Sequence, residues 1–245
     1  MWHDPVRDLG GARLRAARPS SPIPQPPLVL PAILFDLDGT LIDSIGLLVA
    51  SMHHAFADRE QKPPVDEWVA MIGTPLETSL RRWARDEADV QALRARYREF
   101  QFANHDAMTS AYPGAVEMVR DLRAAGHPLA VVTSKLSVGA RKSLAFVGIE
   151  ECFDAVVGIE LTERHKPDPE PVRYALQRIG GVPASNALFV GDSTHDVNAG
   201  NAAGVETAAA LWGPFSRAQL ETAGPTHWLR DFDDLRGVVE RFAMK

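Results

Sequence analysis

The chain of 245 residues holds one cysteine, Cys152, so an internal disulfide is excluded. Unpaired thiols are typical of proteins from a reducing compartment. Cys152 lies between Glu151 and Phe153, and no basic residue adjoins it to favour a reactive thiolate. We therefore expect a cytoplasmic protein in which Cys152 is structural.

Positive charge is also scarce, because 26 lysines and arginines stand against 32 aspartates and glutamates, a formal net charge of -6. This balance lacks the basic footprint of a nucleic-acid-binding protein. No run approaches the ~20 consecutive apolar residues that span a bilayer, and the N-terminus lacks the apolar segment of a secretory signal. We expect neither nucleic acid nor membrane as a partner, and a monomer or homodimer.

Residues 1–31 combine arginines with a Ser/Pro-rich run, a composition that cannot bury a core. We interpret them as a flexible N-terminal extension, and an organellar transit peptide, which is also Arg-rich and acid-poor, is the alternative. The whole chain is 45% hydrophobic and 24% charged, which is ordinary for a globular protein. Its length suffices for one large α/β domain with a smaller companion.

The stretch that organises the rest is residues 32–41, Ala-Ile-Leu-Phe-Asp-Leu-Asp-Gly-Thr-Leu. Its apolar first half predicts a strand buried on both faces. Asp36 and Asp38 follow, and alternate residues of a strand point the same way, so both carboxylates would face the crevice where open α/β sheets bind ligands. Two such acids repel unless a cation compensates, and oxygen ligands favour Mg²⁺. The alternative is a polar turn after the strand.

The chain changes character twice. Residues 46–110 contain helical spacing of apolar residues and no strand-like run, which predicts an all-helical insert. From residue 111 onward, short apolar runs alternate with helical segments that end at glycines. This alternation predicts βαβ units and a parallel sheet. We expect an α/β core domain made of residues 32–45 and 111–245, with residues 46–110 as a separate helical domain.

Three more polar clusters follow predicted strands or precede helices. Thr133 and Ser134 end an apolar run, and a hydroxyl with free backbone N–H groups there suits a phosphate. Asp192 and Asp196 flank a tight turn before a helix, which suits a metal. Lys166 is fixed just before another helix and is the strong cation available for a bound phosphate. Helix capping, or a surface position for the lysine, is the alternative for each cluster taken alone.

Four sequence blocks, residues 35–41, 131–135, 165–169 and 191–196, together resemble the motifs of the haloacid dehalogenase superfamily of hydrolases, in that family's order. The resemblance spans about residue 33 to the C-terminus, and its later part looks most like the phosphoglycolate phosphatase and pyrophosphatase branch. It implies a Rossmann-like parallel sheet core flanked by helices, and the helical insert is placed like that family's C1 cap.

The resemblance also implies roles for the acids. Asp36 would attack phosphorus and become an aspartyl-phosphate, and Asp38 would protonate the leaving oxygen and then activate water. Mg²⁺ would be held by the Asp36 carboxylate, the Asp38 backbone carbonyl and Asp192, with Asp196 in support.

Phosphate contacts are implied as well. Thr133, the Ser134 amide and Lys166 would stabilise charge on the transferring phosphoryl group. The further residues that we expect at the phosphate or substrate are Gly39, Thr40 and Lys135 from the core and Gly73 and Thr74 from a loop of the insert.

These roles predict a Mg²⁺-dependent phosphatase acting on a small phosphorylated metabolite such as phosphoglycolate or a sugar phosphate. A phosphosugar mutase, an inorganic pyrophosphatase and a catalytically silent binding scaffold remain alternatives. The presence of Asp38 argues against a true dehalogenase, because the dehalogenases of this superfamily lack the second acid of this motif. The insert's only lysine, Lys62, lies in a predicted loop, which argues against phosphonate cleavage through a Schiff base.

Overall fold

A computed structural model describes residues 1–2 and 30–242 of the chain. Its main feature is a six-stranded sheet in the order β5-β4-β1-β6-β7-β8, in which every pairing is parallel. The strands are β1 (Ala32–Phe35), β4 (Leu129–Val132), β5 (Ala155–Val157), β6 (Ala187–Gly191), β7 (Glu206–Ala210) and β8 (His227–Leu229). The predicted α/β fold with a parallel sheet is confirmed.

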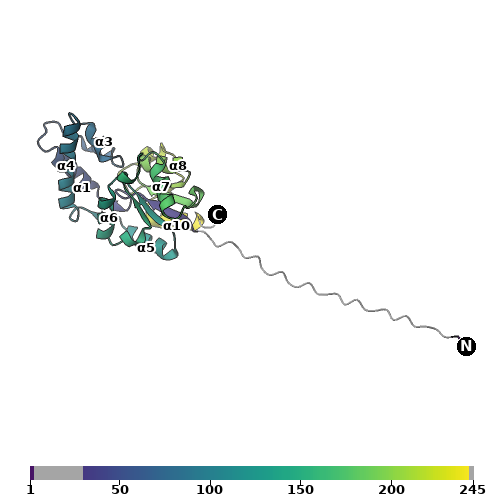
Figure 1. The fold of residues 1–245 in the computed structure, drawn as a ribbon. Coiled ribbons are helices and arrows are strands. Elements are labelled where there is room, and N and C mark those ends of the chain that lie inside the picture. The colour runs from purple at the N-terminus through teal and green to yellow at the C-terminus, as the bar shows by residue number, and fades with distance from the viewer. Residues whose placement is uncertain (3–29, 243–245) are drawn as a thin grey trace.

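The central strand β1 is apolar at every position because both of its faces are covered. Ile33 and Phe35 belong to one core cluster, and Ala32 and Leu34 to the other. The first cluster is shared with α5 (Ala115–Ala125), α6 (Ser137–Phe146) and α10 (Phe232–Phe242). The second is shared with α7 (Glu170–Arg178) and α8 (Thr194–Ala203). Figure 1 shows α7 and α8 on one side of the sheet and α5 and α10 on the other.

A helical insert leaves the sheet domain after β1 and returns before α5. It consists of α1 (Ile45–Ala55), α2 (Val65–Val69), α3 (Leu76–Arg81) and α4 (Glu87–Asn104). Its own apolar cluster is centred on Met52, Phe56, Trp68 and Leu93, separate from the two clusters of the sheet. Figure 1 shows these helices, in blue and purple, standing to one side of the sheet. The division of the chain into a core domain and a cap domain stays a prediction.

The connections differ from the sequence-based expectation in three places. A two-stranded antiparallel ribbon of β2 (Ile42–Asp43) and β3 (Ser110–Ala111) joins the insert to the sheet domain. The ribbon was not predicted, because strands of two residues are too short to show an alternating pattern in the sequence. The all-helical prediction for residues 46–110 did not locate the break between α3 and α4, where Asp86 caps the start of α4 by accepting a hydrogen bond from the Asp89 amide. A short helix, α9 (Arg217–Glu221), was also not predicted.

Three 3₁₀ turns complete the order of elements: Glu150–Cys152, Ile159–Leu161 and Ala184–Asn186. Most of the predicted N-terminal extension, residues 3–29, lies outside the described residues, as do residues 243–245. Among the helices that are described, none combines the length and the apolar character needed to cross a membrane.

Candidate active site

The carboxyl ends of three adjacent strands bring the predicted residues together. Asp36 follows β1, Thr133 follows β4, and Asp192 follows β6. Because these strands are parallel neighbours, their ends meet at one edge of the sheet. The Asp36 amide donates to the Val190 carbonyl at 2.9 Å, which extends the sheet pairing to this residue.

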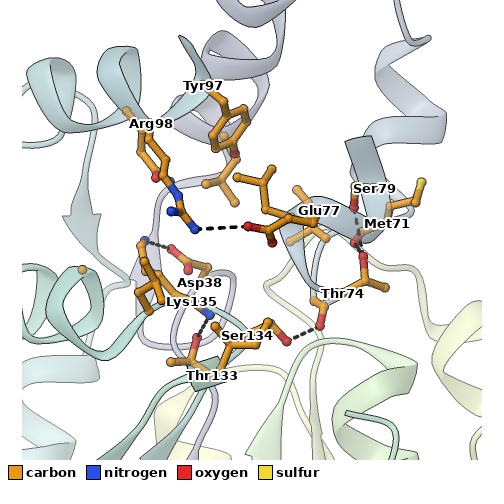
Figure 2. A pocket seen from close by; sticks show the side chains of 18 of the residues that line it. Asp38, Met71, Thr74, Glu77, Ser79, Tyr97, Arg98, Thr133, Ser134 and Lys135 are labelled. Carbon is orange, nitrogen blue, oxygen red and sulfur yellow. Dashed lines mark hydrogen bonds and ion pairs between the residues drawn. The ribbon is translucent and has the colours of Figure 1, made fainter. Parts of the chain in front are cut away.

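Asp38 points away from the strand ends into a cavity. Its Oδ1 accepts hydrogen bonds from Lys135 Nζ at 2.7 Å and from Ser44 Oγ at 2.5 Å. Figure 2 shows the Asp38 and Lys135 side chains facing each other on the floor of that cavity. Ser44 directly precedes α1, so the connection that leads into the insert and the loop after β4 both hold this carboxylate.

The cavity, of about 200 Å³, lies between the sheet domain and the helical insert. The insert lines it mainly with apolar side chains, among them Leu48, Trp68, Met71, Ile72, Leu76 and Phe102. The loop after α2 approaches the sheet domain, because Ser134 Oγ donates to the Gly73 carbonyl at 2.5 Å. Thr74 also lines the cavity, while its hydroxyl donates to the Met71 carbonyl at 2.7 Å (Figure 2).

Lys166 is buried behind Asp36. Its Nζ donates to Asp36 Oδ1 at 2.9 Å, to Asp196 Oδ1 at 2.6 Å and to the Val132 carbonyl at 3.1 Å. Burial by itself would lower the pKa of this lysine, but the charges of Asp196 and then Asp36 outweigh it and raise the pKa. Lys166 is therefore a fixed ammonium at the base of the site.

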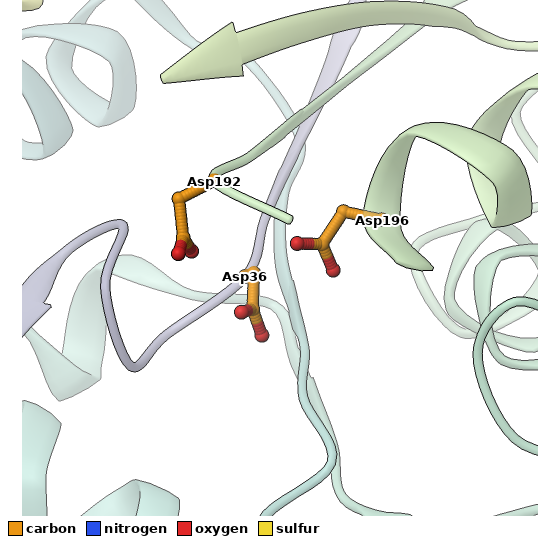
Figure 3. A group of neighbouring side chains, drawn as sticks. All are labelled: Asp36, Asp192 and Asp196. Carbon is orange, nitrogen blue, oxygen red and sulfur yellow. The ribbon is translucent and has the colours of Figure 1, made fainter. Parts of the chain in front are cut away.

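Three buried acids form a cluster around this point. Oxygens of Asp36, Asp192 and Asp196 all lie within 4.8 Å of one another, and Figure 3 shows the three carboxylates converging from different elements. Burial raises the pKa of Asp36 to about 7, against the opposing charge of Lys166. Burial, reinforced by the charges of Asp196 and Asp36, raises the pKa of Asp192 well above its usual value.

The cluster fits a divalent cation. Asp192 Oδ1 accepts from Thr40 Oγ1 at 2.8 Å, whereas the buried Asp192 Oδ2 has no hydrogen-bond partner among the described residues. A buried carboxylate oxygen without a partner is costly, and a hard cation bound by oxygen ligands would compensate it. Gly39 keeps the space open, because it has a φ of +91° and a Cβ there would lie 2.5 Å from Asp192.

The acids differ in how much of their bonding capacity is already used. Asp196 Oδ1 accepts from Lys166 Nζ, while its Oδ2 accepts from the Ser193 amide at 3.0 Å and from the Ser193 hydroxyl at 2.6 Å. These bonds orient Asp196 and, through it, Lys166. Asp36 and Asp192 are therefore the side chains with most capacity left for a cation.

The structure places each predicted residue as follows. The residues that line the cavity are Asp36, Asp38, Gly73, Thr74, Thr133, Ser134 and Lys135. Lys166, Asp192 and Asp196 lie behind Asp36 in the buried cluster. Gly39 and Thr40 sit against Asp192 rather than in the cavity wall. The Thr40 hydroxyl, expected at the phosphate, is bonded to this acid.

Sequence reasoning missed three residues of the site. Ser44 was not among the predicted site residues, although a serine before a helix is a recognisable cap signal. Arg98 and Glu77, which pair with each other on the insert side of the cavity (Figure 2), were not singled out from the sequence. Charged residues are common on helix surfaces, so no local pattern distinguishes these two.

Two residues set aside from the sequence lie outside the site. Cys152 is buried and unpaired, and burial raises the pKa of its thiol, so it has no thiolate character. Lys62 is exposed in the loop between α1 and α2 and does not line the cavity.

Comparisons with known proteins agree with this geometry. Residues 33–210 match the model of the family described as haloacid dehalogenase-like hydrolase. A pyrophosphatase named PpaX from Halalkalibacterium halodurans is 35% identical over 208 residues, 84% of this chain and 95% of its own. A pyrophosphatase of the same name from Bacillus velezensis is 37% identical over 207 residues, 83% of this chain and 94% of its own.

Solved structures give the same answer for the fold. The crystal structure of a predicted phosphoglycolate phosphatase from Haemophilus somnus superposes with a TM-score of 0.79 at 26% identity, covering 85% of this chain and 97% of that one. The family match spans most of the described chain and includes the strand ends that carry the acids. The chain therefore belongs to the haloacid dehalogenase-like hydrolases.

Proposed function

We propose that this protein is a Mg²⁺-dependent phosphatase that hydrolyses a small phosphorylated metabolite through an aspartyl-phosphate at Asp36. The observation that carries the proposal is the position of Asp36 between a buried charged cluster and an open cavity. Behind it lie Lys166 and two acids that suit a cation. In front of it lies a cavity that also contains Asp38.

In the first step, a carboxylate oxygen of Asp36 attacks phosphorus and the bond from phosphorus to the leaving oxygen breaks. Asp38 gives a proton to that oxygen, which leaves as a hydroxyl group. Thr133 and the Ser134 backbone amide, which belong to residues lining the cavity, would donate to the phosphoryl oxygens, while Lys166 would supply fixed positive charge.

In the second step, Asp38 accepts a proton from water as the water oxygen attacks the phosphorus of the aspartyl-phosphate. The bond from phosphorus to the Asp36 oxygen breaks, free phosphate leaves, and the Asp36 carboxylate is restored. Asp38 thus ends protonated and ready for the next cycle.

The cation would be held by Asp36 and Asp192, with Asp196 orienting the site through Ser193 and Lys166. Bound there, Mg²⁺ would offset the repulsion between an anionic nucleophile and an anionic phosphoryl group. The unpartnered oxygen of Asp192 supports this assignment independently of any activity.

The size of the cavity supports a small substrate. About 200 Å³ is below the ~300–1,000 Å³ that is usual for drug-sized ligands. Inorganic pyrophosphate is the second candidate substrate, because two similar proteins with more than 90% of their length matched are named pyrophosphatases.

The test is phosphate release from phosphoglycolate, sugar phosphates, pyrophosphate and nucleotides, measured with Mg²⁺ and with chelator. We expect release only with Mg²⁺, and its loss in Asp36→Asn, whereas Asp233→Asn, an exposed aspartate on α10, keeps full activity. An isomerised sugar phosphate without free phosphate would identify a mutase instead. No release from any substrate, or near-normal turnover by Asp36→Asn, would refute the proposal.

A further inference from the structure

The cavity contains two cations that the mechanism above does not use on the phosphoryl group. Its charged lining residues, among those described, are Asp36, Asp38, Glu77, Arg98 and Lys135. Lys135 comes from the loop after β4, and Arg98 comes from α4 in the helical insert. The two cations therefore approach the same space from opposite sides (Figure 2).

Arg98 is only loosely held. Its guanidinium donates to Glu77 Oε1 at 3.5 Å, the outer limit of a hydrogen bond. The same oxygen accepts from Arg94 at the shorter distance of 3.1 Å. Arg94 does not line the cavity, so it can keep Glu77 neutralised while Arg98 turns to another anion. The Arg98 side chain is 38% exposed, which leaves it accessible to an entering molecule.

The position of these cations relative to the reacting atoms defines what they would meet. The phosphoryl group lies against Asp36, and the leaving oxygen must come within reach of Asp38 to receive its proton. The remainder of the leaving group then occupies the cavity beyond Asp38, where Lys135 and Arg98 lie among apolar walls. An arginine in such a setting binds a carboxylate or phosphate more strongly than it binds a hydroxyl.

We propose that Arg98 is a specificity-determining residue that, with Lys135, selects phosphoryl substrates whose leaving group carries its own negative charge. That charge is a second phosphate or a carboxylate, and substrates with a neutral polyol leaving group are disfavoured. This inference rests on the proposed hydrolysis at Asp36 and adds the class of substrate to it.

The test compares kcat/KM for pyrophosphate and phosphoglycolate, which have anionic leaving groups, with glycerol phosphate and glucose 6-phosphate, which do not. We expect the wild-type protein to prefer the anionic pair. A higher kcat/KM for pyrophosphate than for phosphoglycolate would indicate that the preferred charge is a second phosphate. A higher kcat/KM for phosphoglycolate would indicate a carboxylate.

Arg98→Gln should raise KM for the anionic pair by about 10- to 100-fold, the usual value of a hydrogen bond to a charged group, with kcat little changed. The neutral pair should be affected far less, and Arg98→Lys should recover part of the loss. The matched control is Arg96→Gln on the same helix, because Arg96 pairs with Asp58 outside the cavity. This control should leave KM and kcat for all four substrates unchanged.

Glu77→Gln gives a change of opposite sign. It removes the carboxylate that competes for Arg98, so KM for the anionic pair should fall while KM for the neutral pair stays constant. Asp36-dependent phosphate release without preference for the anionic pair would overturn this inference and leave the proposed function standing. An equal rise in KM for all four substrates in Arg98→Gln would also overturn it. Absence of Asp36-dependent release would remove both.

Discussion

The two walls of the cavity are built differently. On the sheet side, Asp36, Lys166, Asp192 and Asp196 are each no more than 4% exposed. Lys166 holds Asp36 and Asp196 by direct charged hydrogen bonds. On the insert side, Arg98 and Glu77 are 38% and 24% exposed and 3.5 Å apart. Charge pairs buried from water interact strongly, whereas exposed pairs contribute little. The difference indicates that the sheet domain fixes the reacting groups in advance, while the insert keeps its charged groups free to exchange partners.

The largest effect is expected on the sheet side, from Lys166→Met. This change leaves the Asp36 and Asp196 carboxylates buried without their shared ammonium, so activity should fall by about 10²-fold or more. The free energy of unfolding should fall by about 3–5 kcal/mol at neutral pH. Phosphate release and denaturant unfolding check both. Lys62→Met, which removes an exposed lysine that does not line the cavity, is the control and should change neither.

Asp192→Asn should separate activity from stability. The amide removes an unpartnered buried charge, so without metal the variant should be more stable by about 1 kcal/mol, roughly 2–4 °C in Tm. The rise in Tm that Mg²⁺ gives the wild-type protein should disappear, together with activity. Thermal unfolding with Mg²⁺ and with chelator measures this. A wild-type Tm that Mg²⁺ leaves unchanged would argue against a cation at this cluster.

The buried acids also predict how stability depends on pH. The pKa of Asp36 is about 7 in the folded protein, against ~3.9 for an unfolded aspartate. The folded state therefore binds this proton more tightly, and the stability it contributes is lost as pH rises from about 4 through 7. Without metal, Tm should fall between pH 5 and pH 8, and it should fall less steeply in Asp36→Asn. Equal slopes for the two proteins would contradict the assignment.

The smallest effect is expected on the insert side, from Gly73→Ala. Gly73 has a φ of +98°, and a Cβ would lie 3.1 Å from Ser193 Oγ, so the loop must shift away from the sheet domain. KM should rise by about threefold to tenfold while kcat stays within about twofold, since such loops position substrate. Gly180→Ala carries a similar φ of +104° in open space, so it should alter stability but not KM.

Much of this site could be predicted from sequence because it depends on strand ends. Apolar runs such as residues 129–132 locate the strands, and parallel pairing then brings the residue after each strand to one edge. These two rules are enough to predict that Asp36, Thr133 and Asp192 lie close together. Capping near Asp192 and Asp196 was weighed from the sequence only as the alternative to a metal, and the structure has a capping box from Ser193 to Asp196 there.

The rest depended on contacts that no local pattern encodes. Lys135 was expected at the phosphate, but its Nζ pairs with Asp38 across 97 positions of sequence. Arg98 reaches the cavity only because α4 packs against α1 and turns this one of its several arginines inward. The ribbon of β2 and β3 is too short for any periodicity, so its pairing follows from the tertiary fold alone.

That ribbon has a consequence for how such a chain diversifies. Ile42 pairs with Ala111 and Asp43 with Ser110, so the exit and re-entry points of the insert are neighbours, only ~4.8 Å apart across the ribbon. Because the two ends of the inserted segment are adjacent, the sheet does not constrain the length or shape of the residues between them. Exchange of residues 45–109 for another segment would leave the strand order intact. Recombination at these two points would therefore exchange the segment that lines one side of the cavity and keep the strand ends that carry the acids.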